Sequence, residues 1–186
     1  HIMFTLKPTG KAAIVVPTGF ITAQSGIGKK IRQKLVEEKM LAGVVTMPSN
    51  IFATTGTNVS VLFIDKENKD DVILIDASNL GETIKEDGNQ KTILTYDEEE
   101  YIIKTFTTKE VVEDFSVVVS YDELKAKNYS LSAGQYFEVK IEYIDITPED
   151  FVNKIKGFES TLNSFFDESR NLEEKINENL KKLNYE

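Results

Sequence analysis

Residues 49–58 form a polar segment whose residue types suit contacts with nucleic acids. Its hydroxyls and backbone amides suit phosphate or base contacts, and its aromatic residue could stack on a base extruded from a duplex. The alternative is that Ile51 and Phe52 cap the core and the remainder is ordinary loop. The candidate residues are Phe52, Thr54, Thr55, Gly56, Thr57 and Asn58.

A second, shorter segment, Pro17-Thr18-Gly19, follows an apolar run at the point where a strand would end. Open α/β sheets bind their ligands at the carboxyl ends of their strands, which makes Pro17, Thr18 and Gly19 candidate site residues. The alternative is an ordinary turn, because proline stops a strand and glycine permits the reversal.

Composition excludes several other kinds of chemistry. The chain has no cysteine and its single histidine is His1, so most zinc sites and any histidine-dependent catalytic triad are excluded. Gly28-Lys29-Lys30 does not match a phosphate-binding loop, because Ala23 stands where that motif needs glycine and Lys30 where it needs Ser or Thr. The acidic run at 97–100 is typical of a helix amino terminus, so we expect no metal site.

Three apolar segments predict strands, at residues 11–17, 41–48 and 58–65. The first is apolar on both alternating faces, which predicts burial on both sides. Between the first two segments, apolar residues recur at helical spacing from Ile27 to Leu35. The order predicts a strand–helix–strand unit with a third strand appended, which would form half of an α/β sheet.

The next part of the chain is more polar. Residues 72–76 predict a strand paired with the one before it, and residues 77–95 are interpreted as an exposed loop. A helix is predicted to begin with Asp97 as its N-cap. Its inner face is predicted to carry Ile102, Ile103 and Phe106.

The last segment predicts one long helix, with Thr147 as N-cap and Pro148 in the first turn. Apolar residues then alternate at spacings of four and three over roughly 35 residues, which is typical of a coiled-coil seam. The alternative is an amphipathic helix folded back on the sheet, but a length of about 50 Å exceeds the width of a small domain. The seam residues are Phe151, Ile155, Phe158, Leu162, Phe165, Leu172, Ile176 and Leu183.

The net charge of −9 is unevenly distributed along the chain. An acidic chain argues against DNA binding by bulk electrostatics alone. Positive charge is concentrated in one predicted helix, which we interpret either as a solvated outer face or as a phosphate-facing patch. These residues are Lys29, Lys30, Arg32 and Lys34. There is neither a signal peptide nor an apolar run of membrane-spanning length, so we expect a cytoplasmic protein without membrane contact.

Two long stretches resemble a known family. GKAAIVVPTGFITAQSGIGKKIRQKLVEE (10–38) and LAGVVTMPSNIFATTGTNVSVLFIDK (41–66) are similar to the later part of the methyltransferase subunit of type I DNA restriction–modification systems. Asn128-Tyr129-Ser130-Leu131-Ser132, with Gly134 and Tyr136, is similar to the closing segment of that family. The resemblance covers residues 6–136.

The resemblance implies the function of a whole subunit. Members of the family are adenine-N6 DNA methyltransferases that use S-adenosylmethionine. In related enzymes an aromatic residue from the region of Phe52 contacts the flipped base, and residues 17–19 would lie beside the adenine or cofactor pocket. The implied partners are the DNA-specificity subunit, a second methyltransferase subunit, the restriction subunit and DNA. The C-terminal helix would meet the specificity subunit, and a homo-oligomeric coiled coil would substitute when that partner is missing.

Two motifs that such a methyltransferase needs are missing from the chain. One is a glycine-rich turn that approaches S-adenosylmethionine, and the other is an Asn-Pro-Pro-aromatic loop that holds the target amine. No two of the four prolines are adjacent. We therefore expect the C-terminal part of a longer subunit, which alone neither binds the cofactor nor methylates DNA.

The expected fold class is α/β, in two parts. Residues 1–143 would form the second half of a Rossmann-like class I methyltransferase sheet with covering helices. Residues 147–186 would form a C-terminal coiled-coil docking helix. The alternative function is a non-catalytic assembly module that docks the DNA-specificity subunit. A standalone DNA-binding protein is disfavoured by the acidic balance.

Overall fold

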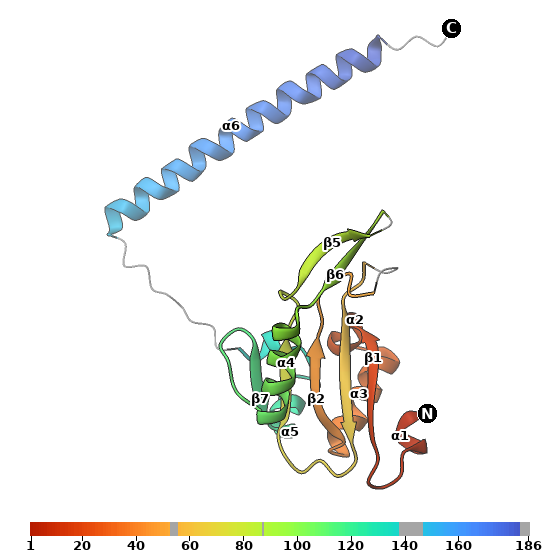
Figure 1. Ribbon diagram of the computed structural model, residues 1–186. Helices are drawn as coiled ribbons and strands as arrows, with labels where there is room; N and C mark the ends of the chain where they lie inside the picture. The colour runs from red at the N-terminus through yellow and green to blue at the C-terminus, as the bar shows by residue number, and fades with distance from the viewer. Residues whose placement is uncertain (53–55, 87, 138–146, 183–186) are drawn as a thin grey trace. The chain divides into compact units, whose positions relative to one another are not determined.

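The computed structural model describes residues 1–52, 56–86, 88–137 and 147–182. The chain divides into two units, His1–Glu138 and Val139–Glu186. The first contains a five-stranded sheet, a separate hairpin and several short helices, and the second contains one long helix (Figure 1). Within the described ranges, no helix is both long enough and apolar enough to cross a membrane.

The elements have the following bounds. The large sheet consists of β1 (Lys11–Pro17), β2 (Leu41–Thr46), β3 (Val59–Asp65), β4 (Val72–Asp76) and β7 (Ser116–Val119). The hairpin consists of β5 (Glu82–Glu86) and β6 (Asn89–Ile93). The helices are α1 (Ile2–Thr5), α2 (Thr18–Thr22), α3 (Gly26–Glu37), α4 (Tyr96–Thr108), α5 (Tyr121–Ala126), the 3-10 turn η1 (Ala133–Gln135) and α6 (Pro148–Lys181).

The strand order of the large sheet is β1-β3-β2-β4-β7. β3 is antiparallel to both β1 and β2, so β1 and β2 run in the same direction, and β4 is parallel to β2. The predicted strand–helix–strand unit is therefore present, with β3 inserted between its two strands. The prediction that β4 pairs with the strand before it is wrong, because β4 pairs with β2 and β7.

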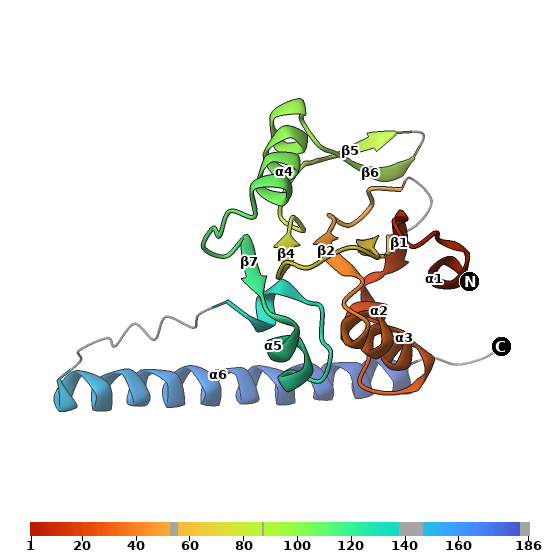
Figure 2. The ribbon, with the colours of Figure 1, turned by 90° about the horizontal axis from the view of Figure 1, so that it is seen from below.

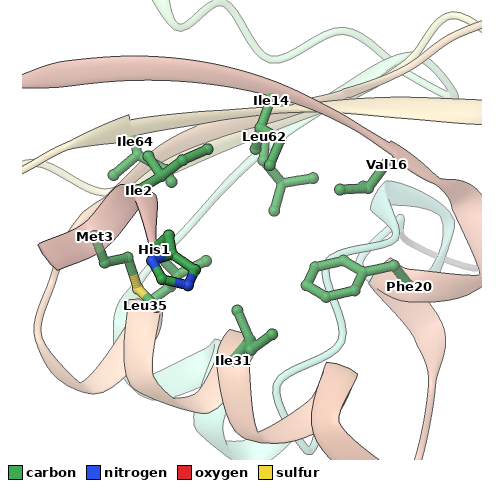
Figure 3. A pocket seen from close by; sticks show the side chains of 10 residues that line it. All are labelled: His1, Ile2, Met3, Ile14, Val16, Phe20, Ile31, Leu35, Leu62 and Ile64. Atoms are coloured by element: carbon green, nitrogen blue, oxygen red, sulfur yellow. The ribbon is translucent and has the colours of Figure 1, made fainter. Parts of the chain in front are cut away.

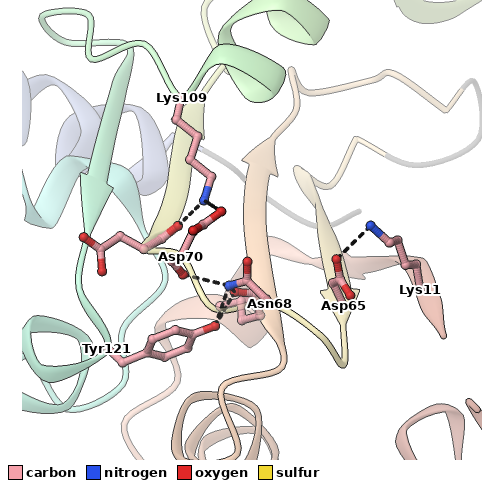
Figure 4. A network of polar contacts seen from close by, with 8 residues as sticks. Lys11, Asp65, Asn68, Asp70, Lys109 and Tyr121 are labelled. Carbon is pink, nitrogen blue, oxygen red and sulfur yellow. Dashed lines mark hydrogen bonds and ion pairs between the residues drawn. The ribbon is translucent and has the colours of Figure 1, made fainter. Parts of the chain in front are cut away.

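The turn from β3 to β4 crosses the amino end of β2, which explains this pairing. Asn68 Nδ2 donates to the carbonyl oxygen of Leu41, the first residue of β2, at 3.0 Å, and to the Tyr121 hydroxyl at 2.7 Å. The Tyr121 hydroxyl donates to the same carbonyl at 2.8 Å (Figure 4). The turn is thereby anchored to β2, and β4 is placed on the side of β2 that β3 does not occupy.

Helices cover the two faces of the sheet, with α4 on one side and α2, α3 and α5 on the other (Figure 2). β4 contributes to both cores. Val72 and Leu74 belong to the cluster with α2, α3 and α5, and Ile73 and Ile75 belong to the cluster with α4. A strand buried on both faces needs no polar alternation, which explains why β4 is a continuous apolar run.

β1 contradicts the prediction of burial on both sides. It lies at the end of the sheet, and burial alternates along it. Ile14 and Val16 pack against the core, whereas Val15 is 50% exposed. Apolar composition does not reveal whether a second layer covers the outer face of a strand. Within the described residues, β1 therefore presents a partly apolar outer face and a free edge.

The interpretation of residues 77–95 as an exposed loop is also wrong. β5 and β6 pair in register from Glu82↔Ile93 to Glu86↔Asn89. Gly88, with φ +82°, adopts the left-handed backbone conformation that glycine favours. The hairpin strands are polar and bury little, so they lack the apolar alternation by which a strand is recognised.

The N-cap of α4 is Thr95, and the prediction of Asp97 is wrong. The Thr95 side chain accepts a hydrogen bond from the Glu98 backbone, and the Glu98 side chain accepts one from Thr95 in return, which forms a capping box. Ile102 is buried and Phe106 packs against the same core. Ile103 is 63% exposed, so its predicted place on the inner face is wrong.

The second unit contains α6, which begins as the sequence predicts. The Thr147 hydroxyl accepts a hydrogen bond from the Asp150 backbone N–H at 3.1 Å. None of the described residues of α6 is buried, and the described seam residues are between 40% and 68% exposed. Leu183 lies outside the described residues. Pairing of the seam with another helix stays a prediction.

We predict that Gly43→Ala destabilises the first unit. A Cβ atom at Gly43 would lie 2.5 Å from the Phe106 ring and 2.8 Å from the Ile73 carbonyl oxygen. Overpacking of this kind costs about 1–3 kcal/mol, which chemical denaturation would measure. Gly134→Ala is the control, because a Cβ there meets nothing within 4 Å. Equal stability of the two variants would contradict the packing described here.

Candidate functional site

The carboxyl ends of three parallel strands lie together at one end of the sheet, the carboxyl edge, which is distinct from the free edge along β1. β1 ends at Pro17, β2 at Thr46 and β4 at Asp76, and β3 begins there with Val59. The edge lies at the upper end of the sheet in Figure 1. Ligands of open α/β sheets bind outside the carboxyl ends of the strands, so this is the place where a site is expected.

A row of hydroxyl groups joins the strands just inside this edge. Thr18 Oγ1 lies 3.2 Å from Ser60 Oγ, and Ser60 Oγ donates to Thr46 Oγ1 at 3.4 Å. The Thr18 backbone N–H donates to the Asn58 carbonyl oxygen at 3.0 Å. Ser60 is fully buried and Thr46 nearly so. The structure thus brings together Thr18 and Asn58, which lie far apart in the sequence and were both predicted as site residues.

Sequence reasoning missed Ser60 and Thr46. The available signal was a small hydroxyl residue inside or at the end of an otherwise apolar strand. Such a residue needs a hydrogen-bond partner when it is buried. Because these hydroxyls satisfy one another, they act as a brace between strands β1, β3 and β2.

The other predicted site residues that the structure describes are exposed. Pro17 and Gly19 are exposed, as are Gly56 and Thr57. Thr54 and Thr55 lie outside the described residues. Phe52 is 49% exposed, whereas its neighbour Ile51 is partly buried. Half exposure leaves the Phe52 ring available to a ligand, and its contact with a base stays a prediction.

The β5–β6 hairpin adjoins the same loop. The Thr92 backbone N–H donates to the Asn50 carbonyl oxygen at 2.9 Å. Across the hairpin, the Thr92 and Thr83 hydroxyl oxygens are 3.1 Å apart. A shallow hollow of about 350 Å³ lies between the loop and the hairpin, with Met47 and Ile51 on one side and Thr92 on the other. The hairpin was not anticipated as part of the site.

Glu98 fixes the base of the hairpin. Its Oε1 accepts from the Gly81 N–H at 2.8 Å and its Oε2 from the Thr95 N–H at 2.7 Å. These bonds stabilise the ionised carboxylate, and the bond from Thr95 contributes most to lowering the pKa of Glu98 from its usual 4.5.

Arg32 joins the helices behind the edge to the closing segment of the unit. Its Nε donates to the Tyr129 carbonyl oxygen at 2.8 Å, and its Nη1 and Nη2 donate to the carbonyl oxygens of Phe20 and Ala23. Arg32 is fully buried, and this burial lowers the pKa of its guanidinium group. The prediction that Arg32 belongs to an exposed basic surface is therefore wrong.

The described residues do not form a cradle for S-adenosylmethionine. Gly26 and Gly28 open α3 and do not directly follow a strand, because β1 runs into α2. An apolar cavity of about 300 Å³ lies between α1, β1, β3 and α3 (Figure 3). Apart from His1, its lining side chains are all apolar, which does not suit a cofactor with a charged amino-acid group and a ribose. In the described part of the chain, no three His, Asp or Glu side chains cluster as metal ligands would.

Comparison with known proteins agrees with the architecture. The family model described as N-6 DNA Methylase matches residues 1–143. The MjaIX methylase subunit of a type I restriction enzyme from Methanocaldococcus jannaschii is 31% identical over 100% of this chain and 34% of that protein. The MpnII methylase subunit from Mycoplasma pneumoniae is 30% identical over 95% of this chain and 31% of that protein.

A solved structure has a similar fold. It is the methyltransferase subunit of a type I restriction–modification system from Streptococcus thermophilus, with a TM-score of 0.65 and 28% sequence identity. The match covers 73% of this chain and 28% of that one. The chain therefore belongs to the N-6 DNA methylase family, as the sequence resemblance predicted, and it spans about a third of the length of the curated relatives named here.

We predict that Glu98 makes stability depend on pH in a defined direction. The pKa of Glu98 is lower in the folded chain than its usual 4.5. The stability that its ionised carboxylate contributes is therefore fully present above pH 4.5 and is lost as the pH falls through the folded-state pKa. Glu98→Gln should therefore lower the melting temperature near neutral pH and lower it progressively less in acid.

Glu100→Gln is the matched control, since it removes an acidic group from the same helix. No hydrogen bond to the Glu100 side chain occurs among the described residues. A melting-temperature difference between wild type and Glu98→Gln that is constant from neutral to acid pH would contradict the assigned role of the carboxylate.

Proposed function

We propose that this chain is the later half of the catalytic domain of a type I modification subunit, together with its docking helix. The complete subunit would transfer a methyl group from S-adenosylmethionine to adenine N6 in DNA. The observation that carries the proposal is the family match over residues 1–143, combined with an exposed aromatic residue, Phe52, at the carboxyl edge of the sheet.

The free edge of β1 supports the view that the sheet continues into a part of the subunit outside this chain. β1 ends the sheet, and its outer residues Ala13 and Val15 are exposed although they are apolar. Exposed edge strands invite pairing with another strand, and proteins usually protect them. A neighbouring strand from the rest of the subunit would complete a Rossmann-like sheet and would bring the missing cofactor and target-amine motifs to the same edge.

The residues of this chain would then have defined tasks. Phe52 would stack on the extruded adenine, and the exposed loop residues Gly56 and Thr57 would approach the adjacent backbone. Thr18, Thr46 and Ser60 would hold β1, β2 and β3 in register, because their hydroxyls are already paired. The chain alone, whose described residues form no cofactor cradle, is expected to be inactive.

The second task of the chain is assembly, and it belongs to α6. Its apolar seam is unburied within its own unit, and an exposed apolar surface of that length marks an interaction site. The proposed partner is the DNA-specificity subunit, in a complex that also contains a second methyltransferase subunit and the restriction subunit. A homo-oligomeric coiled coil is the alternative occupant of the seam.

We predict that Phe52→Ala in the complete subunit impairs methyl transfer without affecting assembly. Stacking of a base on an aromatic side chain contributes about 1–3 kcal/mol, so its loss should reduce the rate about 5- to 150-fold. The assay is incorporation of labelled methyl groups into duplex DNA. Phe4→Ala is the control, because Phe4 is 77% exposed on α1 and remote from the proposed site. Unchanged methylation by Phe52→Ala would contradict the role of the ring.

We predict that Leu162→Glu combined with Phe165→Glu abolishes complex formation. Two buried charges in a helical seam are strongly unfavourable. Co-purification with the specificity subunit measures the effect, and circular dichroism checks that the helix still forms.

The control for the seam variant is Ser160→Glu combined with Ser164→Glu. It adds the same charge to the same helix, but on the side away from the seam at helical spacing. Equal assembly by the seam variant and this control would exclude the seam as the docking surface.

A further inference from the structure

Two neighbouring lysines, Lys29 and Lys30, lie in the first turns of α3. Lys34, one turn further on, forms an ion pair of 3.2 Å with Glu38, and Lys125 forms one of 2.9 Å with Asp122. Within the described residues, neither Lys29 nor Lys30 has a carboxylate partner. No acidic residue stands three or four positions away from either on the helix.

This placement is electrostatically unfavourable for the folded chain itself. Positive side chains near the amino end of a helix are repelled by the helix dipole, and the first turn of α3 contains no acidic residue to offset them. The chain as a whole carries a charge of −9, so carboxylates are plentiful elsewhere. The charges of Lys29 and Lys30 are therefore not compensated by a carboxylate of the described residues and are available to an external anion.

The two lysines lie at the same edge of the sheet as the candidate site. α2 and α3 connect the carboxyl end of β1 to the amino end of β2, so α3 begins near the edge at which β1 ends. A Cβ atom at Gly28 would lie 3.4 Å from the Phe20 ring, which places the first turn of α3 directly on α2. α2 itself begins at Thr18, whose N–H is bonded to the Asn58 carbonyl.

Arg32 gives the lysine pair a fixed position. By donating to the carbonyl oxygens of Phe20 and Ala23, its buried guanidinium group clamps α3 to the end of α2. The backbone that carries Lys29 and Lys30 is thereby held relative to the edge of the sheet. A cationic pair on a fixed backbone loses less conformational freedom on binding than one on a mobile loop.

We propose that Lys29 and Lys30 bind phosphate groups of the DNA backbone beside the base that enters the site. The inference rests on the proposed function, since it assigns a phosphate contact to the same sheet edge. Lysine binds phosphate as a point charge and reads no base edge, so this contact would position DNA without contributing sequence specificity.

The test measures how the affinity for duplex DNA depends on salt, using the complete subunit assembled with its specificity subunit. It compares the unmutated assembly with one that carries both Lys29→Gln and Lys30→Gln. Each phosphate contact contributes about 0.9 to the slope of log affinity against log salt, so the slope should fall by about 1.8. Between 50 and 200 mM salt, the unmutated assembly should lose about 12-fold more affinity than the variant.

The matched control is Lys7→Gln combined with Lys69→Gln, which removes the same charge from the opposite edge. Lys7 precedes β1, Lys69 lies between β3 and β4, and both are exposed. The control should keep the slope of the unmutated assembly. A fall of equal size in both variants would reduce the effect to bulk charge and overturn the inference.

Other outcomes separate the inference from the proposed function. An unmutated assembly that methylates DNA, together with an unchanged slope in the Lys29/Lys30 variant, overturns the inference alone. Failure of that variant to assemble with the specificity subunit would make the lysines a protein contact, which also overturns the inference. An unmutated assembly that fails to methylate DNA contradicts the proposed function, and the inference falls with it. Melting of the variant at an equal or higher temperature than wild type is expected, because an unfavourable charge pair is removed.

Discussion

The pairing of β3 with both β1 and β2 is the constraint on which the site depends. Because β3 is antiparallel to each neighbour, β1 and β2 are parallel and their carboxyl ends meet at one edge. The register places Ser60 opposite Val16 and Thr46, and its buried hydroxyl is within hydrogen-bonding reach of Thr46 and Thr18. A slip of one residue would turn these hydroxyls to the other face and separate the two loops that form the candidate site.

Arg32 supplies the second connection, behind that edge. A buried cation is costly unless its hydrogen bonds are satisfied, and here three backbone carbonyls accept them, two from α2 and its C-cap and one from the closing segment. The closing segment is also bonded through the Leu131 N–H to the Ile21 carbonyl at 3.0 Å. Helix α2, which follows β1, is therefore held by residues more than a hundred positions away, which couples the site to the end of the unit.

The sequence predicted features that depend on local pattern and missed those that depend on long-range contacts. The strands of the crossover unit, the Thr147 cap and the family follow from apolar runs, capping residues and long similar stretches. The pairing of β4 was predicted wrongly because it depends on long-range hydrogen bonds. Asn68 and Tyr121 both donate to the Leu41 carbonyl oxygen and so anchor the turn between β3 and β4 to the amino end of β2. The sequence analysis placed Arg32 on the surface. Its burial depends on three backbone carbonyl acceptors, and a pattern of side chains does not reveal such acceptors.

The free edge of β1 offers the most direct test of the claim that this chain completes a larger catalytic sheet. Hydrogen exchange of the β1 amides would be measured in this chain alone and in the complete subunit. The account predicts that the β1 amides not bonded to β3 exchange rapidly in the chain and become protected in the subunit, because a neighbouring strand accepts their hydrogen bonds. Equally rapid exchange of those amides in a folded, complete subunit would contradict it.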